Sequence, residues 1–200
     1  MGNHFRFWSI NTHPNIQNFS IVVDYLGGKP AVIVETGSSA WGTDSTRLWD
    51  AYVTKFGGSL QSVDLSKAAS QRLRFQLGRK TRLHVSDSVS FLKKYNGPKV
   101  DFVYLDSWDV DPNDPVSSAI HGLEEFKAIY SSLKIGSLVL VDDTPEFYSE
   151  EDFIKYPRCR DFKDKYGVVA GKGAFILVKM KDFKGIEIIS HSYSLLLRYS

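Results

Sequence analysis

The sequence has little cysteine, no long apolar run and no excess of charge of one sign. Its single cysteine, Cys159, excludes an internal disulfide and a zinc site built from several cysteines, and it fits a reducing compartment. No apolar run approaches the roughly 20 residues that span a bilayer. Residues 1–10 also lack the charged region and the long apolar stretch of a signal peptide. We therefore expect a cytoplasmic protein with no membrane partner.

The charge balance gives no indication of a nucleic-acid partner. Lysine and arginine number 25 against 23 aspartate and glutamate, for a net charge of +2, and the basic residues are scattered. Nucleic-acid binding usually needs a basic patch or stripe, so we expect none here. With 200 residues, 42% of them hydrophobic, the chain is long enough for one sizeable core and is expected to form a single domain.

Strand and helix patterns alternate along the chain. Short apolar runs predict strands at 31–35, 59–63, 81–85, 100–105 and 137–141, and two more at 174–180 and 186–193. Helices are expected at 16–26, 45–56, 66–77, 88–95 and 116–133, and from 149 until Pro157 interrupts. This alternation predicts an α/β, doubly wound, mostly parallel sheet with helices on both faces. The linker KDFKG is too short for a helical crossover, so the last two strands should form an antiparallel hairpin.

Acidic residues end or follow the first five expected strands. They are Glu35, Asp64, Asp87, Asp106 and the pair Asp142–Asp143. In an open parallel sheet, ligands bind outside the carboxyl ends of the strands, where these side chains should gather. Such a row would suit ribose hydroxyls, amino groups or a metal ion. The functional site is therefore expected at this edge of the sheet.

The loop after the first strand, VETGSS, could accommodate a ligand close to the main chain. Gly37 permits a sharp turn, the small Ser38 and Ser39 allow close approach, and the following helix N-terminus suits an anion. The dinucleotide fingerprint G-x-G-x-x-G and the P-loop motif are both absent, which argues against NAD and ATP. A glycine turn without any ligand is the alternative. Glu35 belongs to a strand that should be buried, so it needs a partner such as an ammonium or a backbone donor.

Asp64 and Asp87 each allow two interpretations. Asp64 could accept hydrogen bonds from ribose hydroxyls, or it could cap the helix that starts near Ser66. Asp87 could bind an adenine amino group, or it could cap the next helix.

The segments VETGSS, SVDLS, VSDS, DFVYLDSWD and GSLVLVDDT occur in an order that resembles class I S-adenosylmethionine-dependent methyltransferases. The resemblance covers about residues 31–145. It implies a Rossmann-like sheet of seven strands in the order 3-2-1-4-5-7-6, with an N-terminal helical cap (1–28) before the methyltransferase domain (29–200). It also implies S-adenosylmethionine as the methyl donor. The residues that it places at the cofactor are Glu35, Gly37, Ser38, Ser39, Asp64, Asp87, Ser88, Asp106 and Trp108. For Trp108, ordinary core packing is the alternative.

Two segments, YLDSW and LVDD, resemble the metal-dependent small-molecule O-methyltransferases of the catechol and macrolide-sugar types. That resemblance implies a magnesium ion bound by Asp106, Asp142 and Asp143. A bound cation lowers the pKa of an acceptor hydroxyl and orients it. The alternatives are that Asp106 contacts cofactor or substrate without a metal, and that Asp142–Asp143 simply form a turn.

The sequence offers three candidates for the general base. The catechol branch has a lysine three residues after its first ligand, whereas this chain has Asp109 there. Asp109, Asp111 or His121 could accept the proton instead. The lysine in the GKG segment at 171–173 is interpreted as part of a loop that enters the strand 174–180.

Together these observations predict a methyltransferase that modifies a hydroxyl of a small molecule. The alternatives are a metal-independent N-methyltransferase and a catalytically degenerate module that only binds the nucleotide. The N-terminal aromatic residues Phe5, Phe7 and Trp8 could cover the active site or form a homodimer contact.

Overall fold

The computed structural model describes residues 14–38 and 45–200. Ser39 of the predicted cofactor loop lies outside these ranges, as do the N-terminal aromatic residues Phe5, Phe7 and Trp8 and the first part of the proposed cap. Within the described ranges, none of the helices combines the length and the apolar composition needed to cross a membrane.

The structure has one seven-stranded sheet in the order β3-β2-β1-β4-β5-β7-β6, as predicted. Strands β1 to β5 are parallel, and β7 runs antiparallel to both β5 and β6. The strands are β1 (Ala31–Thr36), β2 (Gly58–Asp64), β3 (Thr81–Val85), β4 (Val100–Leu105), β5 (Leu133–Val141), β6 (Ile186–His191) and β7 (Leu195–Tyr199). This is a Rossmann-like methyltransferase fold.

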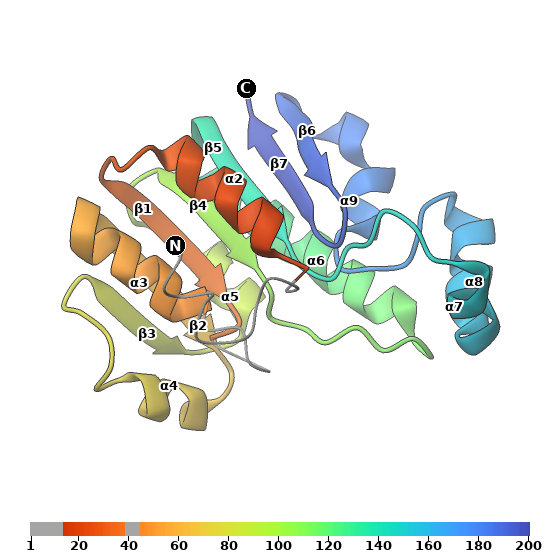
Figure 1. The fold of residues 1–200 in the computed structure, drawn as a ribbon, viewed down its shortest axis with the longest axis horizontal. Helices are drawn as coiled ribbons and strands as arrows, with labels where there is room; N and C mark the ends of the chain where they lie inside the picture. Colours follow the sequence, from red (N-terminus) through yellow and green to blue (C-terminus); the bar gives the residue numbers. More distant parts are fainter. Residues whose placement is uncertain (1–13, 39–44) are drawn as a thin grey trace.

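Helices cover both faces of the sheet (Figure 1). One face carries α2 (Ile16–Leu26) and α3 (Ser45–Phe56), and the other carries α5 (Ser88–Lys93), α6 (Pro115–Tyr130) and α9 (Ala174–Val178). The remaining helices are α4 (Lys67–Leu73), α7 (Glu150–Lys155), α8 (Pro157–Tyr166) and the 3-10 turn η1 (Met180–Asp182). As predicted, Ser149 opens α7 with a capping box to Asp152.

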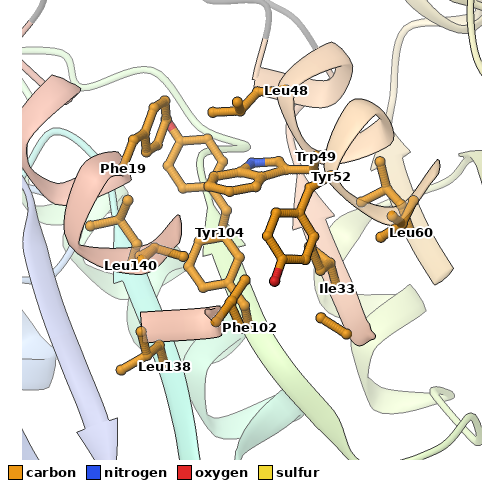
Figure 2. Close-up of a cluster of buried hydrophobic side chains, with 14 of the residues drawn as sticks. Phe19, Ile33, Leu48, Trp49, Tyr52, Leu60, Phe102, Tyr104, Leu138 and Leu140 are labelled. Carbon is orange, nitrogen blue, oxygen red and sulfur yellow. The ribbon is translucent and has the colours of Figure 1, made fainter. Parts of the chain in front are cut away.

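Each strand contributes to two cores because successive side chains point to opposite faces. In β4, Phe102 and Tyr104 pack with Phe19 and Trp49 beneath α2 and α3, as Figure 2 shows. Their neighbours Val103 and Leu105 pack on the other face beneath α6. Buried apolar side chains on both faces explain why the strands read as continuous apolar runs rather than as an alternating pattern.

The structure corrects the prediction of a strand at 174–180, because residues Ala174–Val178 form α9 instead. Ala174 and Ile176 are fully buried, and Ile176 belongs to the core that includes residues of α6. A short apolar run fits a buried helix as well as a buried strand, so its spacing could not decide. The C-terminal hairpin is formed by β6 and β7.

Three predicted helices end earlier than expected. The helix expected at 66–77 ends at Leu73, the one expected at 88–95 ends at Lys93, and the one expected at 116–133 ends at Tyr130. Leu133 opens β5 instead of ending the helix.

Candidate active site

The ends of three neighbouring strands bring the predicted acids to one edge of the sheet. Strand β1 lies between β2 and β4, and Glu35 is directly beside Ser62 on one side and Tyr104 on the other. Gly37 has a φ of 81°, and a Cβ atom there would lie 2.1 Å from the carbonyl oxygen of Asp106. Only glycine therefore lets the loop after β1 approach the end of β4 this closely.

Glu35 is fully buried and is held by hydroxyl groups. Thr46 Oγ1 and Ser62 Oγ each donate to its Oε2 atom at 2.6 Å. Burial raises the pKa of Glu35 to about 7, although hydrogen bonds from Ser45, Ser62 and Thr46 oppose that rise. Its other oxygen, Oε1, is buried and has no hydrogen-bond partner among residues 14–38 and 45–200. A ligand ammonium or amide would satisfy that atom, so the residue fits the donor-binding role that the resemblance gives it.

Asp64 connects the loops after β1 and β2. Its Oδ2 atom accepts the Ser38 amide at 2.8 Å, and its Oδ1 atom accepts the Ser66 amide at 2.6 Å. The cap of α4 is Ser66, whose hydroxyl accepts the Ala69 amide, so Asp64 is not the N-cap. A carboxylate oxygen accepts more than one hydrogen bond, so Asp64 still has capacity for ribose hydroxyls.

Asp87 is an exposed helix cap. Its carboxylate accepts the Ser90 amide at 2.7 Å at the start of α5, and hydrogen bonds to Ser90 lower its pKa. The capping interpretation therefore holds for this residue, and its contact with adenine stays a prediction.

The three predicted metal ligands lie together, but a lysine lies among them. Lys172 Nζ is 2.5 Å from Asp106 Oδ1 and 2.9 Å from Asp143 Oδ2, and its side chain is only 4% exposed. Asp142 is satisfied differently, by hydrogen bonds from Asn15 Nδ2 at 2.7 Å and Tyr104 Oη at 2.5 Å. Each of the three carboxylates is thus already engaged by groups of this chain.

Electrostatics favour a charged Lys172. Burial alone would lower the pKa of Lys172, but the carboxylates of Asp106, Asp143 and Asp142 outweigh it and raise that pKa. Burial and the nearby Asp142 raise the pKa of Asp106 against the opposing effect of Lys172. Burial, together with Asp106 and Asp142, also keeps Tyr104 protonated by raising its pKa.

The cluster does not fit a magnesium ion in this arrangement. Among residues 14–38 and 45–200, no group of three or more histidine, cysteine, aspartate or glutamate side chains is arranged to hold a metal. The space between Asp106 and Asp143 is taken by the Lys172 ammonium, which no divalent ion can share. The role of Asp106, Asp142 and Asp143 as metal ligands stays a prediction.

His121 and Ser88 belong to a separate network on the α6 side of the sheet. His121 Nε2 lies 2.8 Å from Ser107 Oγ and 3.2 Å from Ser88 Oγ. Ser107 Oγ also donates to the buried Glu125 at 2.7 Å. In the described part of the chain, His121 has no hydrogen bond to the acids at the other face. The structure therefore does not bring this predicted base together with Asp106.

Trp108 is 44% exposed, and its ring lies 4.9 Å from that of His121. Ordinary core packing, the alternative for Trp108, does not describe this position.

A hollow of about 600 Å³ opens beside the lysine cluster. It is lined by Asp109, Val110, Pro112, Asp143, Pro145, Phe147, Tyr148, Asp152 and Tyr193. Tyr193 donates a hydrogen bond to Asp143, so the hollow adjoins the cluster directly. Asp109, predicted as a base, is exposed at its edge. The mixture of carboxylates and aromatic rings suits a small polar molecule.

Sequence reasoning missed Lys172, Tyr104, Tyr193 and Asn15. The GKG segment gave a signal for Lys172 but was assigned to a strand entry. Tyr104 was predicted only as part of a strand. Asn15 and Tyr193 stand in polar surroundings that carry no motif, so nothing local marked them.

Comparison with solved structures identifies the fold. No protein-family model matches the chain, and no curated protein sequence does. The MycE methyltransferase from the mycinamycin biosynthetic pathway, solved with Mg and SAH, matches with a TM-score of 0.69 at 13% identity. The match covers 98% of this chain and 53% of MycE, so the chain spans about half the length of that protein.

Two further structures have similar folds. A SAM-dependent methyltransferase from Methanosarcina mazei matches with a TM-score of 0.58 at 14% identity, covering 89% of this chain and 94% of that one. A putative sarcosine dimethylglycine methyltransferase from Galdieria sulphuraria matches with a TM-score of 0.51 at 14% identity, over 88% and 63% of the two chains. The chain thus has the fold of class I SAM-dependent methyltransferases.

Proposed function

We propose that the protein transfers a methyl group from S-adenosylmethionine to a hydroxyl of a small molecule. The observation that carries the proposal is the row of acids at the ends of three adjacent strands, Asp64 of β2, Glu35 of β1 and Asp106 after β4. The ligand edge of an open α/β sheet is where such acids can bind a nucleoside and an amino-acid moiety. The solved structures with the same fold include methyltransferases, one of them with SAH.

In this proposal Asp64 accepts the ribose hydroxyls, and the loop at Gly37 and Ser38 lies against the methionine moiety. Bound S-adenosylmethionine supplies an electrophilic methyl group on a sulfonium. The chain aligns an acceptor oxygen with that methyl, since transfer depends mostly on in-line positioning. As the oxygen–methyl bond forms and the sulfur–methyl bond breaks, the hydroxyl proton passes to a carboxylate. Asp109, at the edge of the hollow, is the proposed acceptor of that proton.

A small-molecule acceptor is supported by the hollow beside Asp143 and by the MycE structure that contains mycinamycin VI. The predicted metal is not part of this proposal, because Lys172 already neutralises the acids that would bind it. The lysine favours the alternative in which Asp106 contacts cofactor or substrate without a metal. A cytoplasmic location and a homodimer stay predictions.

Calorimetric titration with S-adenosylhomocysteine in the presence of EDTA tests the proposal. We expect binding in the micromolar range, corresponding to about −8 kcal/mol. Asp64→Asn should weaken binding at least about tenfold, because it removes a negative charge and one acceptor from the proposed ribose site.

The matched control is Asp101→Asn, which changes an acid near the opposite end of β4 that pairs with Lys134. It should leave the affinity unchanged. If folded wild-type protein gives no heat of binding at high ligand concentration, the proposed use of S-adenosylmethionine is contradicted.

A further inference from the structure

The ammonium of Lys172 occupies the place that the sequence resemblance gives to a divalent metal. It bridges Asp106 and Asp143, two of the three predicted ligands. Magnesium would need its oxygen ligands at about 2.0–2.1 Å, within the volume that Nζ now fills between these carboxylates. The third predicted ligand, Asp142, is held by Asn15 and Tyr104, which carry no charge.

We propose that Lys172 is a built-in cation that replaces the divalent metal and positions the acceptor oxygen of the methyl-transfer reaction. Its part in catalysis rests on the proposed function, whereas its exclusion of a metal does not. The protein would then work without magnesium. Lys172 is a positioning residue that neither forms a covalent bond nor exchanges a proton.

The backbone around Lys172 is fitted to this position. The Lys172 amide donates to the carbonyl of Asp143 at 3.1 Å. A Cβ atom at Gly122 in α6 would lie 2.2 Å from the Lys172 carbonyl oxygen, and one at Gly171 would lie 2.6 Å from the Asp143 carbonyl oxygen. Both close approaches require glycine. The lysine is therefore anchored between α6 and the turn after β5, and its position does not depend on a flexible side chain alone.

The turn that receives Lys172 is itself unusual. Asp143 has a φ of 41°, the one positive value among non-glycine residues in the described ranges. A left-handed backbone costs roughly 1–2 kcal/mol for such a residue, so it persists only where its surroundings hold it. Here Lys172 binds Asp143 through both main chain and side chain, and Tyr193 donates to the same carboxylate.

The ammonium has a donor left for a substrate. An ammonium group has three N–H donors, and Asp106 and Asp143 accept two of them. No group in the described part of the chain accepts the third. Lys172 itself does not line the 600 Å³ hollow, but its partner Asp143 does, so an acceptor oxygen would approach the lysine from the Asp143 end of the hollow. The fixed charge would stabilise negative charge that develops on that oxygen, as a metal does.

Manganese binding tests the exclusion of a metal directly, because Mn²⁺ is a paramagnetic probe for carboxylate sites. Wild-type protein should leave the electron paramagnetic resonance signal of free Mn²⁺ unchanged up to about 1 mM. Lys172→Met, which keeps the side chain as far as Cε but removes the ammonium, should bind Mn²⁺ at least about tenfold more tightly than the wild type. Asp143→Asn added to Lys172→Met should abolish that site. Lys172→Arg should behave like the wild type because it keeps the cation.

The matched control is Lys134→Met, which removes a lysine paired with Asp101 at the other end of the sheet and should create no site. Mn²⁺ binding to the wild type that Asp143→Asn abolishes would overturn the proposal, and so would a folded Lys172→Met that binds no Mn²⁺. If Lys172→Met does not fold, the wild-type and Lys172→Arg titrations still decide. If the proposed function is wrong, the titration with S-adenosylhomocysteine in EDTA will show no binding, whatever the result with Mn²⁺.

Discussion

Two neighbouring polar groups use adjacent residues of one loop in different ways. Asp106 joins Lys172 and Tyr104, whereas the next residue, Ser107, joins His121 and Glu125 of α6. The first group is charged and adjoins a hollow, and the second is a network of mostly neutral donors and acceptors between helices. Adjacency in sequence therefore does not place residues in the same group, because Asp106 and Ser107 both follow the end of β4 and their side chains contact different neighbours.

The largest expected effect is on stability, at the close contact between Gly37 and Asp106. Gly37→Ala should lower the free energy of unfolding by about 3 kcal/mol or more, because its Cβ would collide with the Asp106 carbonyl oxygen. Gly167→Ala is the matched control, since Gly167 has a similar φ of 75° but no atom within 4 Å of the added Cβ. It should cost only about 1–2 kcal/mol. Equal losses in urea denaturation would contradict the importance of this close approach.

Glu35→Gln should change the way in which the free energy of unfolding depends on pH. The folded-state pKa of Glu35, about 7, exceeds its ordinary value of 4.5. Its contribution to stability is therefore fully present below about pH 4.5 and is lost as the pH rises through about 7. Glutamine cannot ionise. The free energy of unfolding of the variant, relative to that of the wild type, should therefore increase by on the order of 3 kcal/mol between pH 4 and pH 9.

The control for this prediction is Glu124→Gln on the surface of α6, where Lys127 lowers the pKa of the glutamate. That variant should show a small change of opposite sign. A gain for Glu35→Gln that does not vary with pH would contradict the raised pKa.

The smallest effect is expected at His121. Comparing variants of His121 and Asp109 shows which of the two accepts the proton. With an acceptor found by screening, Asp109→Asn should reduce the rate of methyl transfer by about 10²-fold. His121→Ala should change that rate less than about threefold and should cost about 1 kcal/mol of stability, because it breaks its hydrogen bonds to Ser88 and Ser107. Loss of turnover in His121→Ala with Asp109→Asn unaffected would reverse the assignment.

Local sequence patterns predicted the order of most elements and the position of the acids. Short apolar runs followed by an acid identified the ends of β1, β2 and β4, and the capping residues identified the starts of several helices. These features depend on neighbours within a few residues, so local spacing reveals them. The strand order came with the family resemblance, and the structure confirms it.

Which charged side chains contact one another depends on the packing of elements that are distant in sequence. Lys172 reaches Asp106 across 66 positions of sequence, through a segment that forms a helix entry where a strand was predicted. Asn15 reaches Asp142 across 127 positions. Such contacts depend on how α2 and the segment before α9 pack against the sheet, and no local pattern encodes that packing. For the same reason, the sequence predicted three acids around a metal, and only the fold revealed the lysine between two of them.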